Sequence, residues 1–140
     1  PDSGELTPIG NYQTGDDSVP FSIAIAPNGK YLYVANIGFN TVTAFEIDPD
    51  SGELTPIGNY QTGDDSNPQS ITVDPNGNYV YVANSNTDTI RTFEINQDSG
   101  TLSKSGDDVA TGEYPVSVVV VRIWQNIDDM DNVLDGVAYD

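Results

Sequence analysis

Apolar and polar residues alternate along short segments of this chain, and turn-forming residues separate the segments. Alternation with a period of two is typical of β-strands that have different neighbours on their two faces. A Pro-Asn-Gly-Lys turn at residues 27–30 joins the first two segments as a hairpin. The segments that we expect to be strands in this unit are residues 21–26 (FSIAIA), 31–36 (YLYVAN), 41–47 (TVTAFEI) and 53–60 (ELTPIGNY). The last contains Pro56 and Gly58, which suit the outer edge of a sheet.

The same pattern returns at a fixed interval. Residues 1–18 (PDSGELTPIGNYQTGDDS) recur unchanged as residues 49–66, an offset of 48 residues, and a third copy begins at Gln97 and then fades. A period of about 40 to 50 residues carried by strands is typical of β-propeller blades. We therefore predict an all-β chain of propeller blades, each made of four antiparallel strands, A to D from the hub outward. The predicted division is a strand D at 5–13, blades at 19–62 and 67–110, and a strand A at 116–121.

This division predicts an incomplete ring. A chain of 140 residues holds about three such blades, whereas closed propellers have roughly four to eight. We expect the ring to be completed by oligomerisation, with two chains and six blades as the simplest closed form, or by missing sequence. Residues 122–140 form an acidic C-terminal tail, which could complete a third blade or be a helical or disordered tail. A homo-oligomer and the remainder of a longer propeller are therefore the expected partners.

Composition narrows the range of functions. Asp and Glu number 22 against 4 Lys and Arg, for a net charge of -18, so nucleic acid is not an expected partner. The chain has no Cys and no His, which removes thiolate chemistry and the usual general base near neutral pH. The longest apolar run, around residues 118–121, is far shorter than the roughly 20 residues of a membrane span. We expect an extracellular or cell-surface location.

Paired acidic residues recur in the predicted connections from strand D to the next strand A. On stacked blades these pairs share a face with the loops between strands B and C, which carry Asn36, Asn40, Asn84, Asn86 and Asp88. Carboxylate and amide oxygens suit calcium, the one cofactor that we predict. The alternative is that the acidic residues form turns and cap their own backbone. The candidate metal ligands are Asp16, Asp17, Asp64, Asp65, Asp107 and Asp108.

Two segments closely resemble the YVTN and lactonase-type β-propeller repeat families. They are residues 27–36 (PNGKYLYVAN) and 75–84 (PNGNYVYVAN), supported by the TVTAFEI and TIRTFEI strands and the DSGELT turn, and the resemblance extends from residue 1 to about 121. It implies a seven-bladed ring. Some lactonase-like members are 6-phosphogluconolactonases, and YVTN-type members include surface-layer proteins. No catalytic residue is carried over, because the only cations, Lys30, Arg91, Lys104 and Arg122, are too scattered to form a phosphate pocket.

The leading interpretation is a non-enzymatic, secreted or surface module for binding and assembly. Its strand D at 5–13 would add main-chain hydrogen bonds to an exposed sheet edge. One alternative is a lactone hydrolase that uses Asp17, Asp65 or Asp108 as base or metal ligand. Another is a structural repeat of a surface layer or fibre.

Overall fold

The computed structural model describes residues 7–121, which form nine β-strands and no helix. The prediction of an all-β fold is confirmed. The strands are β1 (Pro20–Ile25), β2 (Tyr31–Asn36), β3 (Thr41–Ile47), β4 (Leu54–Gln61), β5 (Pro68–Val73), β6 (Tyr79–Asn84), β7 (Thr89–Ile95), β8 (Leu102–Lys104) and β9 (Val109–Ala110).

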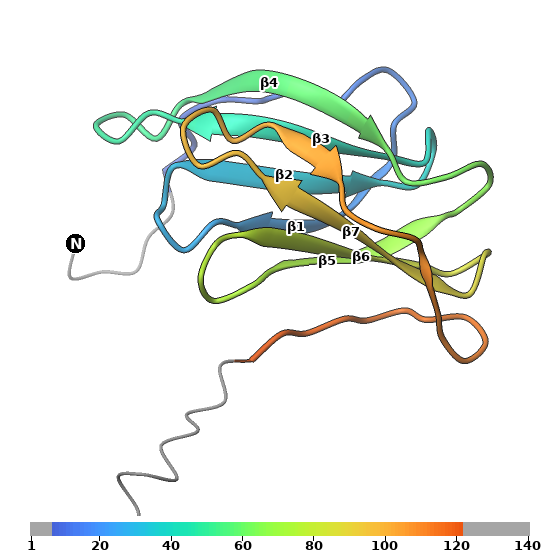
Figure 1. Cartoon of the computed structure of the whole chain (residues 1–140). Coiled ribbons are helices and arrows are strands. Elements are labelled where there is room, and N and C mark those ends of the chain that lie inside the picture. Colours follow the sequence, from blue (N-terminus) through green and yellow to red (C-terminus); the bar gives the residue numbers. More distant parts are fainter. Residues whose placement is uncertain (1–6, 122–140) are drawn as a thin grey trace, which may run out of the picture.

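The strands form two antiparallel sheets that lie against each other as two blades (Figure 1). The first sheet has the order β1-β2-β3-β4, and the second has the order β5-β6-β7-β8, with β9 also paired to β7. Chain order equals spatial order because short turns connect neighbours. In the β1–β2 turn, Gly29 has φ 72°, and Asn28 Oδ1 accepts a hydrogen bond from the Lys30 N–H at 2.9 Å.

The three inner strands of the two sheets pair in the same register. Leu32 pairs with Phe45 across β2 and β3, and Val80 pairs with Phe93 across β6 and β7, which is the same pairing moved by 48 residues. The first strand of each sheet also has an irregularity at the same place, after its initial proline. A position in the inner strands of one blade can therefore be compared directly with its counterpart in the other, whereas the pairing of β7 with β9 is shifted by one residue relative to that of β3 with β4.

The core lies between the two sheets. Tyr33, Val42 and Ala44 of the first sheet are fully buried in one cluster with Val80 and Val82 of the second. Close packing of such apolar side chains is the main stabilising contribution of the fold.

Polar and aromatic contacts orient the two sheets. The Tyr33 hydroxyl donates to the Gly100 carbonyl at 3.0 Å, and desolvation raises the pKa of Tyr33, so this hydroxyl remains a donor. Tyr60 of β4 contacts the edge of Phe93 with a centroid distance of 6.4 Å. The outer strand of the first blade thus covers part of the second.

The predicted strand D at 5–13 is wrong for the residues that the structure describes, since residues 7–13 are not in a strand. They run along one face of the first sheet, where Tyr12 packs against Leu32, Val34 and Phe45. Tyr12 stands at the repeat position of Tyr60, so the segment lies where the outer strand of a preceding blade would lie. A strand needs a hydrogen-bonded neighbour, and residues 7–121 provide none for this segment.

The predicted strand A at 116–121 is also wrong, because these residues are not in a strand. As for residues 7–13, the described part of the chain provides no neighbouring strand with which they could pair. They nevertheless lie beside the second sheet as an inner strand would. The Val118 N–H donates to Ser70 Oγ at 3.1 Å, which repeats the bond from the Ile71 N–H to Ser22 Oγ at 3.3 Å. The predicted contribution of residues 122–140 to a third blade lies outside the described residues.

None of the described residues belongs to a helix that could cross a membrane.

Replacement of Gly100 by alanine tests the packing between the blades. Gly100 has φ 69°, and a Cβ there would clash with the Tyr31 ring of the other sheet. We expect Gly100→Ala to lower the free energy of unfolding by roughly 2–4 kcal/mol, from backbone strain plus overpacking. Urea denaturation measures this loss.

Gly29→Ala is the matched control, because Gly29 has φ 72° but nothing within 4 Å of the new Cβ. It should lose only about 1 kcal/mol. Equal losses in the two variants would show that Gly100 serves its turn and not the contact between sheets.

Candidate functional site

The connections between blades and the loops between middle strands meet on one face of the molecule, which we call the loop face. It comprises residues 14–19, 37–40, 62–67, 85–88 and 111–114. Backbone hydrogen bonds tie these segments together, such as Thr62 N–H to the Asn40 carbonyl at 2.8 Å and Ser85 N–H to the Asn67 carbonyl at 3.1 Å. The first blade thereby sets the position of the loops of the second.

Two of the polar loop residues expected beside the candidate metal ligands have a structural role. Asn40 Oδ1 accepts from the Asn67 N–H at 2.8 Å, and Asp88 Oδ1 accepts from the Tyr114 N–H at 2.7 Å. Asn67 and Tyr114 both have positive φ, 51° in each case, and both precede a proline. The side-chain oxygens hold this unusual backbone in place.

Asn36 and Asn84 do not open on the loop face as expected, because both side chains are fully buried. Asn36 Nδ2 donates to Thr43 Oγ1 at 2.8 Å, and Asn84 Nδ2 donates to the Thr62 carbonyl at 3.1 Å. Each fixes the end of a strand. Of the five polar residues predicted for these loops, Asn86 is thus the one that is both exposed and not required to hold backbone.

Among residues 7–121, Asn86 belongs to a polar cluster that the second blade has and the first blade lacks. Its amide lies 3.5 Å from Asp65 Oδ1, and Asn67 Nδ2 donates to Asn86 Oδ1 at 3.4 Å and to Ser85 Oγ at 2.7 Å. The counterpart of Asn86 in the first blade is Gly38, where a Cβ would overlap the Asp17 carbonyl oxygen. The duplicated Gly-Asp-Asp-Ser segment therefore has a different chemical environment in each blade.

The acidic pairs are not brought together as a metal site. Asp16, Asp17, Asp64 and Asp65 are exposed, and within residues 7–121 no three Asp, Glu, His or Cys side chains are placed to hold a metal ion. Calcium binding at these residues stays a prediction.

The sequence suggested that Asp107 and Asp108 lie in a connection between blades. The structure places them elsewhere. They lie between β8 and β9, within the outer strand of the second sheet. Asp108 accepts from Arg91 Nε at 2.9 Å and from Arg91 Nη2 at 2.6 Å, and Lys104 Nζ lies 3.6 Å away. The Arg91 hydrogen bond holds the pKa of Asp108 below its ordinary value, although partial burial opposes the shift.

The Arg91–Asp108 pair was missed at the sequence level. Arg91 also donates through Nη1 to the Gln61 carbonyl at 3.1 Å, so it links the outer strands of both blades. Its counterpart in the first blade, Thr43, bonds Asn59 Oδ1 at 2.6 Å across the same strands. At the 48-residue offset Asn59 aligns with Asp107, so the paired change from Thr–Asn to Arg–Asp becomes visible only when the one-residue shift of the outer strand is taken into account.

The fold and its repeated loop contacts define this chain as blades of a β-propeller. The chain matches the family described as lactonase, 7-bladed beta-propeller, over residues 1–120, and it belongs to that family. A search among curated proteins found no match.

Solved structures similar to this chain include lactonases. A protein from Bacteroides fragilis, provisionally assigned as a 6-phosphogluconolactonase, is 34% identical with a TM-score of 0.63, over 69% of this chain and 27% of that one. A periplasmic gluconolactonase from Pseudomonas aeruginosa is 29% identical with a TM-score of 0.63, over 67% of this chain and 26% of that one. A protein from Lactobacillus plantarum is 35% identical with a TM-score of 0.63, over 69% and 28%.

The chain therefore spans about a quarter of the length of these relatives. This share agrees with two sheets out of a seven-bladed ring.

Removal of the Asp108 charge tests the Arg91 ion pair. The folded-state pKa is lowered, so the stabilisation is present above the ordinary pKa near 4 and is lost as the pH falls through the lowered value. We expect Asp108→Asn to lower the free energy of unfolding at pH 7 by about 1–2 kcal/mol. The difference from the wild type should shrink below about pH 4. Denaturant melts at several pH values measure both effects.

Asp107→Asn is the control, because Asp107 is the exposed neighbour. A loss in Asp107→Asn as large as in Asp108→Asn would contradict the ion-pair explanation.

Proposed function

We propose that this chain is part of a lactone hydrolase whose substrate is a sugar lactone. Family membership supports this proposal, together with two similar structures named as gluconolactonase and, provisionally, 6-phosphogluconolactonase. These comparisons favour the hydrolase over the non-enzymatic module that the sequence suggested first.

The observation that carries the proposal at residue level is the Asp65–Asn86–Asn67 cluster on the loop face. It combines the exposed carboxylate of Asp65 with the amide of Asn67 from the same loop and the amide of Asn86 from the neighbouring loop. Asn86 Nδ2 lies 3.5 Å from Asp65 Oδ1, and Asn67 Nδ2 lies 3.4 Å from Asn86 Oδ1. A carboxylate can accept the proton of a water that attacks the lactone carbonyl, after which the ring C–O bond breaks and the ring oxygen takes up a proton. The amides can bind sugar hydroxyls.

Charge favours a lactone without a phosphate group. Arg91 is committed to Asp108 and to the Gln61 carbonyl, and Lys30 lies in the β1–β2 turn, at the end opposite the loop face. Lys104, the remaining cation of residues 7–121, lies 3.6 Å from Asp108 in the outer strand of the second sheet. Within these residues no free cation therefore faces the cluster, while the chain carries a net charge of -18. Such a surface repels a phosphorylated substrate.

We expect Asp65→Asn to lower kcat/KM for gluconolactone by on the order of 10²-fold, as for loss of a general base. Asp17→Asn is the matched control, because Asp17 has the same repeat position and a positive φ of 57° but faces Gly38 instead of an asparagine. It should retain nearly full activity. A titrimetric assay of acid release measures hydrolysis.

Equal loss in Asp17→Asn and Asp65→Asn, or full activity in both, would contradict the assigned role of Asp65. Absence of hydrolysis across a panel of neutral and phosphorylated lactones would overturn the proposed function. A chelator control belongs to the same assay, since loss of activity that calcium restores would support the predicted metal ligands.

The surface-layer or fibre role and the extracellular or cell-surface location remain predictions. Fractionation of the source cells tests the location.

A further inference from the structure

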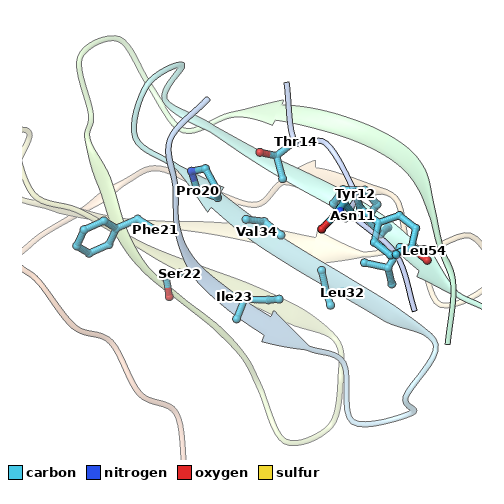
Figure 2. A pocket seen from close by; sticks show the side chains of 12 residues that line it. Asn11, Tyr12, Thr14, Pro20, Phe21, Ser22, Ile23, Leu32, Val34 and Leu54 are labelled. Carbon is cyan, nitrogen blue, oxygen red and sulfur yellow. The ribbon is translucent and has the colours of Figure 1, made fainter. Parts of the chain in front are cut away.

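The first hairpin turn of each blade contains an Asn-Gly pair. It is formed by residues 28–29 between β1 and β2, and by residues 76–77 between β5 and β6, and both asparagines are exposed. Ile23 and Val34 pair across the first of these hairpins (Figure 2). A glycine has no Cβ to obstruct the approach of its backbone nitrogen to the side-chain amide of a preceding asparagine. Each turn is therefore a candidate site of deamidation, the reaction in which an asparagine side chain loses ammonia.

The backbone of the two turns is the same. The Gly29 N–H donates to the Ala26 carbonyl at 2.9 Å, and the Gly77 N–H donates to the Asp74 carbonyl at 2.9 Å. The two glycines have similar positive φ angles, 72° and 77°. In either turn the glycine N–H must leave its carbonyl before its nitrogen can attack a side chain. The rate of deamidation therefore depends on how often each turn opens.

A buried carboxylate holds the second turn closed. Asp74 Oδ2 accepts from the Asn76 N–H at 3.0 Å. Its Oδ1 accepts from the Asn78 N–H at 2.6 Å and from the Tyr79 N–H at 2.8 Å. Hydrogen bonds to an ionised carboxylate are roughly twice as strong as those between neutral groups. Opening of this turn must break or distort these bonds, so it is costly.

The residues that support the second turn are replaced in the first. Ala26 stands at the repeat position of Asp74 and has no side-chain acceptor. The Gly77 carbonyl also accepts from Gln97 Nε2 at 2.6 Å. The repeat position of Gln97 is Pro49, whose side chain has no donor. The first turn thus opens more easily than the second, for reasons that lie in the residues of the two repeats themselves.

One hydrogen bond of the first turn also favours the reaction. The Lys30 N–H donates to Asn28 Oδ1 at 2.9 Å. When the Gly29 nitrogen attacks Cγ of Asn28, negative charge develops on this Oδ1. A donor already aimed at an oxygen stabilises the charge that develops there.

We propose that Asn28 deamidates spontaneously in the folded protein, whereas Asn76 is protected. The Gly29 nitrogen forms a bond to Cγ of Asn28 and loses its proton to a solvent base, and the Cγ–Nδ2 bond breaks as ammonia leaves. Water then opens the resulting succinimide ring at either carbonyl, which gives aspartate or isoaspartate. The modification adds a negative charge at the end of the blade opposite the loop face, so the proposal does not depend on the proposed lactone hydrolysis.

The test compares the two sites within one chain. The folded 140-residue protein is incubated in mildly alkaline buffer and digested with trypsin, which cuts after Lys30 and Arg91 and so places the sites in different peptides. Mass spectrometry with electron-transfer fragmentation locates each conversion and distinguishes isoaspartate from aspartate. We expect Asn28 to convert at least about tenfold faster than Asn76. Equal rates, or a faster reaction at Asn76, would overturn the proposal.

The same chain in concentrated urea is the control for local sequence. Both sites then lie in a Pro-Asn-Gly segment without the hydrogen bonds of the fold, so their rates should agree within about twofold. A preference for Asn28 that is as large in urea as in the folded protein would arise from local sequence, and the proposal would be wrong.

Two variants test the protecting carboxylate. Asp74→Ala should raise the rate at Asn76 severalfold and leave Asn28 unchanged, and Ala26→Asp should slow Asn28. Asp64→Ala is the matched control, because Asp64 is an exposed aspartate of the loop face, and both rates should stay as in the wild type. Urea melts establish that each variant is folded. An unchanged rate at Asn76 in folded Asp74→Ala would contradict the proposed protection, and the wild-type comparison decides the proposal even if a variant does not fold.

Discussion

Burial of sheet faces between neighbouring blades is the constraint on which this structure depends. A four-stranded sheet has two apolar faces and cannot cover both by itself. The first sheet meets this requirement on one side by packing Tyr33 and Val42 against Val80 and Val82. On its other side, the segment that carries Tyr12 is the part of residues 7–121 that covers some of the surface. The described chain is therefore a section of a stack, and its ends retain the chemistry of internal surfaces.

A small set of hydrogen bonds, repeated in each unit, fixes the position of each blade relative to the one before it. Asn40 holds the backbone of Asn67, and Asp88 holds that of Tyr114 in the same way. Because these contacts occupy the same positions in each unit, the sequence is free to vary elsewhere. The exchanges of Gly38 for Asn86 and of Thr43 for Arg91 are variations of this kind. They place a polar cluster and an ion pair in the second blade, while the pairing of β6 with β7 remains that of β2 with β3.

The corrected positions of the acidic residues change how the charge of this protein is interpreted. Asp108 is neutralised by Arg91 within an outer strand, and Asp65 lies near an asparagine amide on the loop face. Asp65 and Asp108 are each the second aspartate of a Gly-Asp-Asp segment, yet they have different surroundings. With the family membership, this difference moves the interpretation from a uniformly acidic rim toward a particular carboxylate in a lactonase-type propeller.

The sequence alone determined the repeat, the all-β class, the family and the middle strands, since the predicted segments 31–36 and 41–47 coincide with β2 and β3. These features follow from local alternation and turn residues, which act over a few positions. Tertiary structure alone decided the status of residues 7–13 and 116–121, because a strand exists only beside a hydrogen-bonded neighbour, which is often distant in the chain. It also decided the place of Asp107 and Asp108. Compared with the preceding unit, the segment from Leu102 to Thr111 is one residue longer, and the segment from Thr111 to Pro115 is two residues shorter. These changes nearly cancel, so the overall repeat pattern does not reveal them.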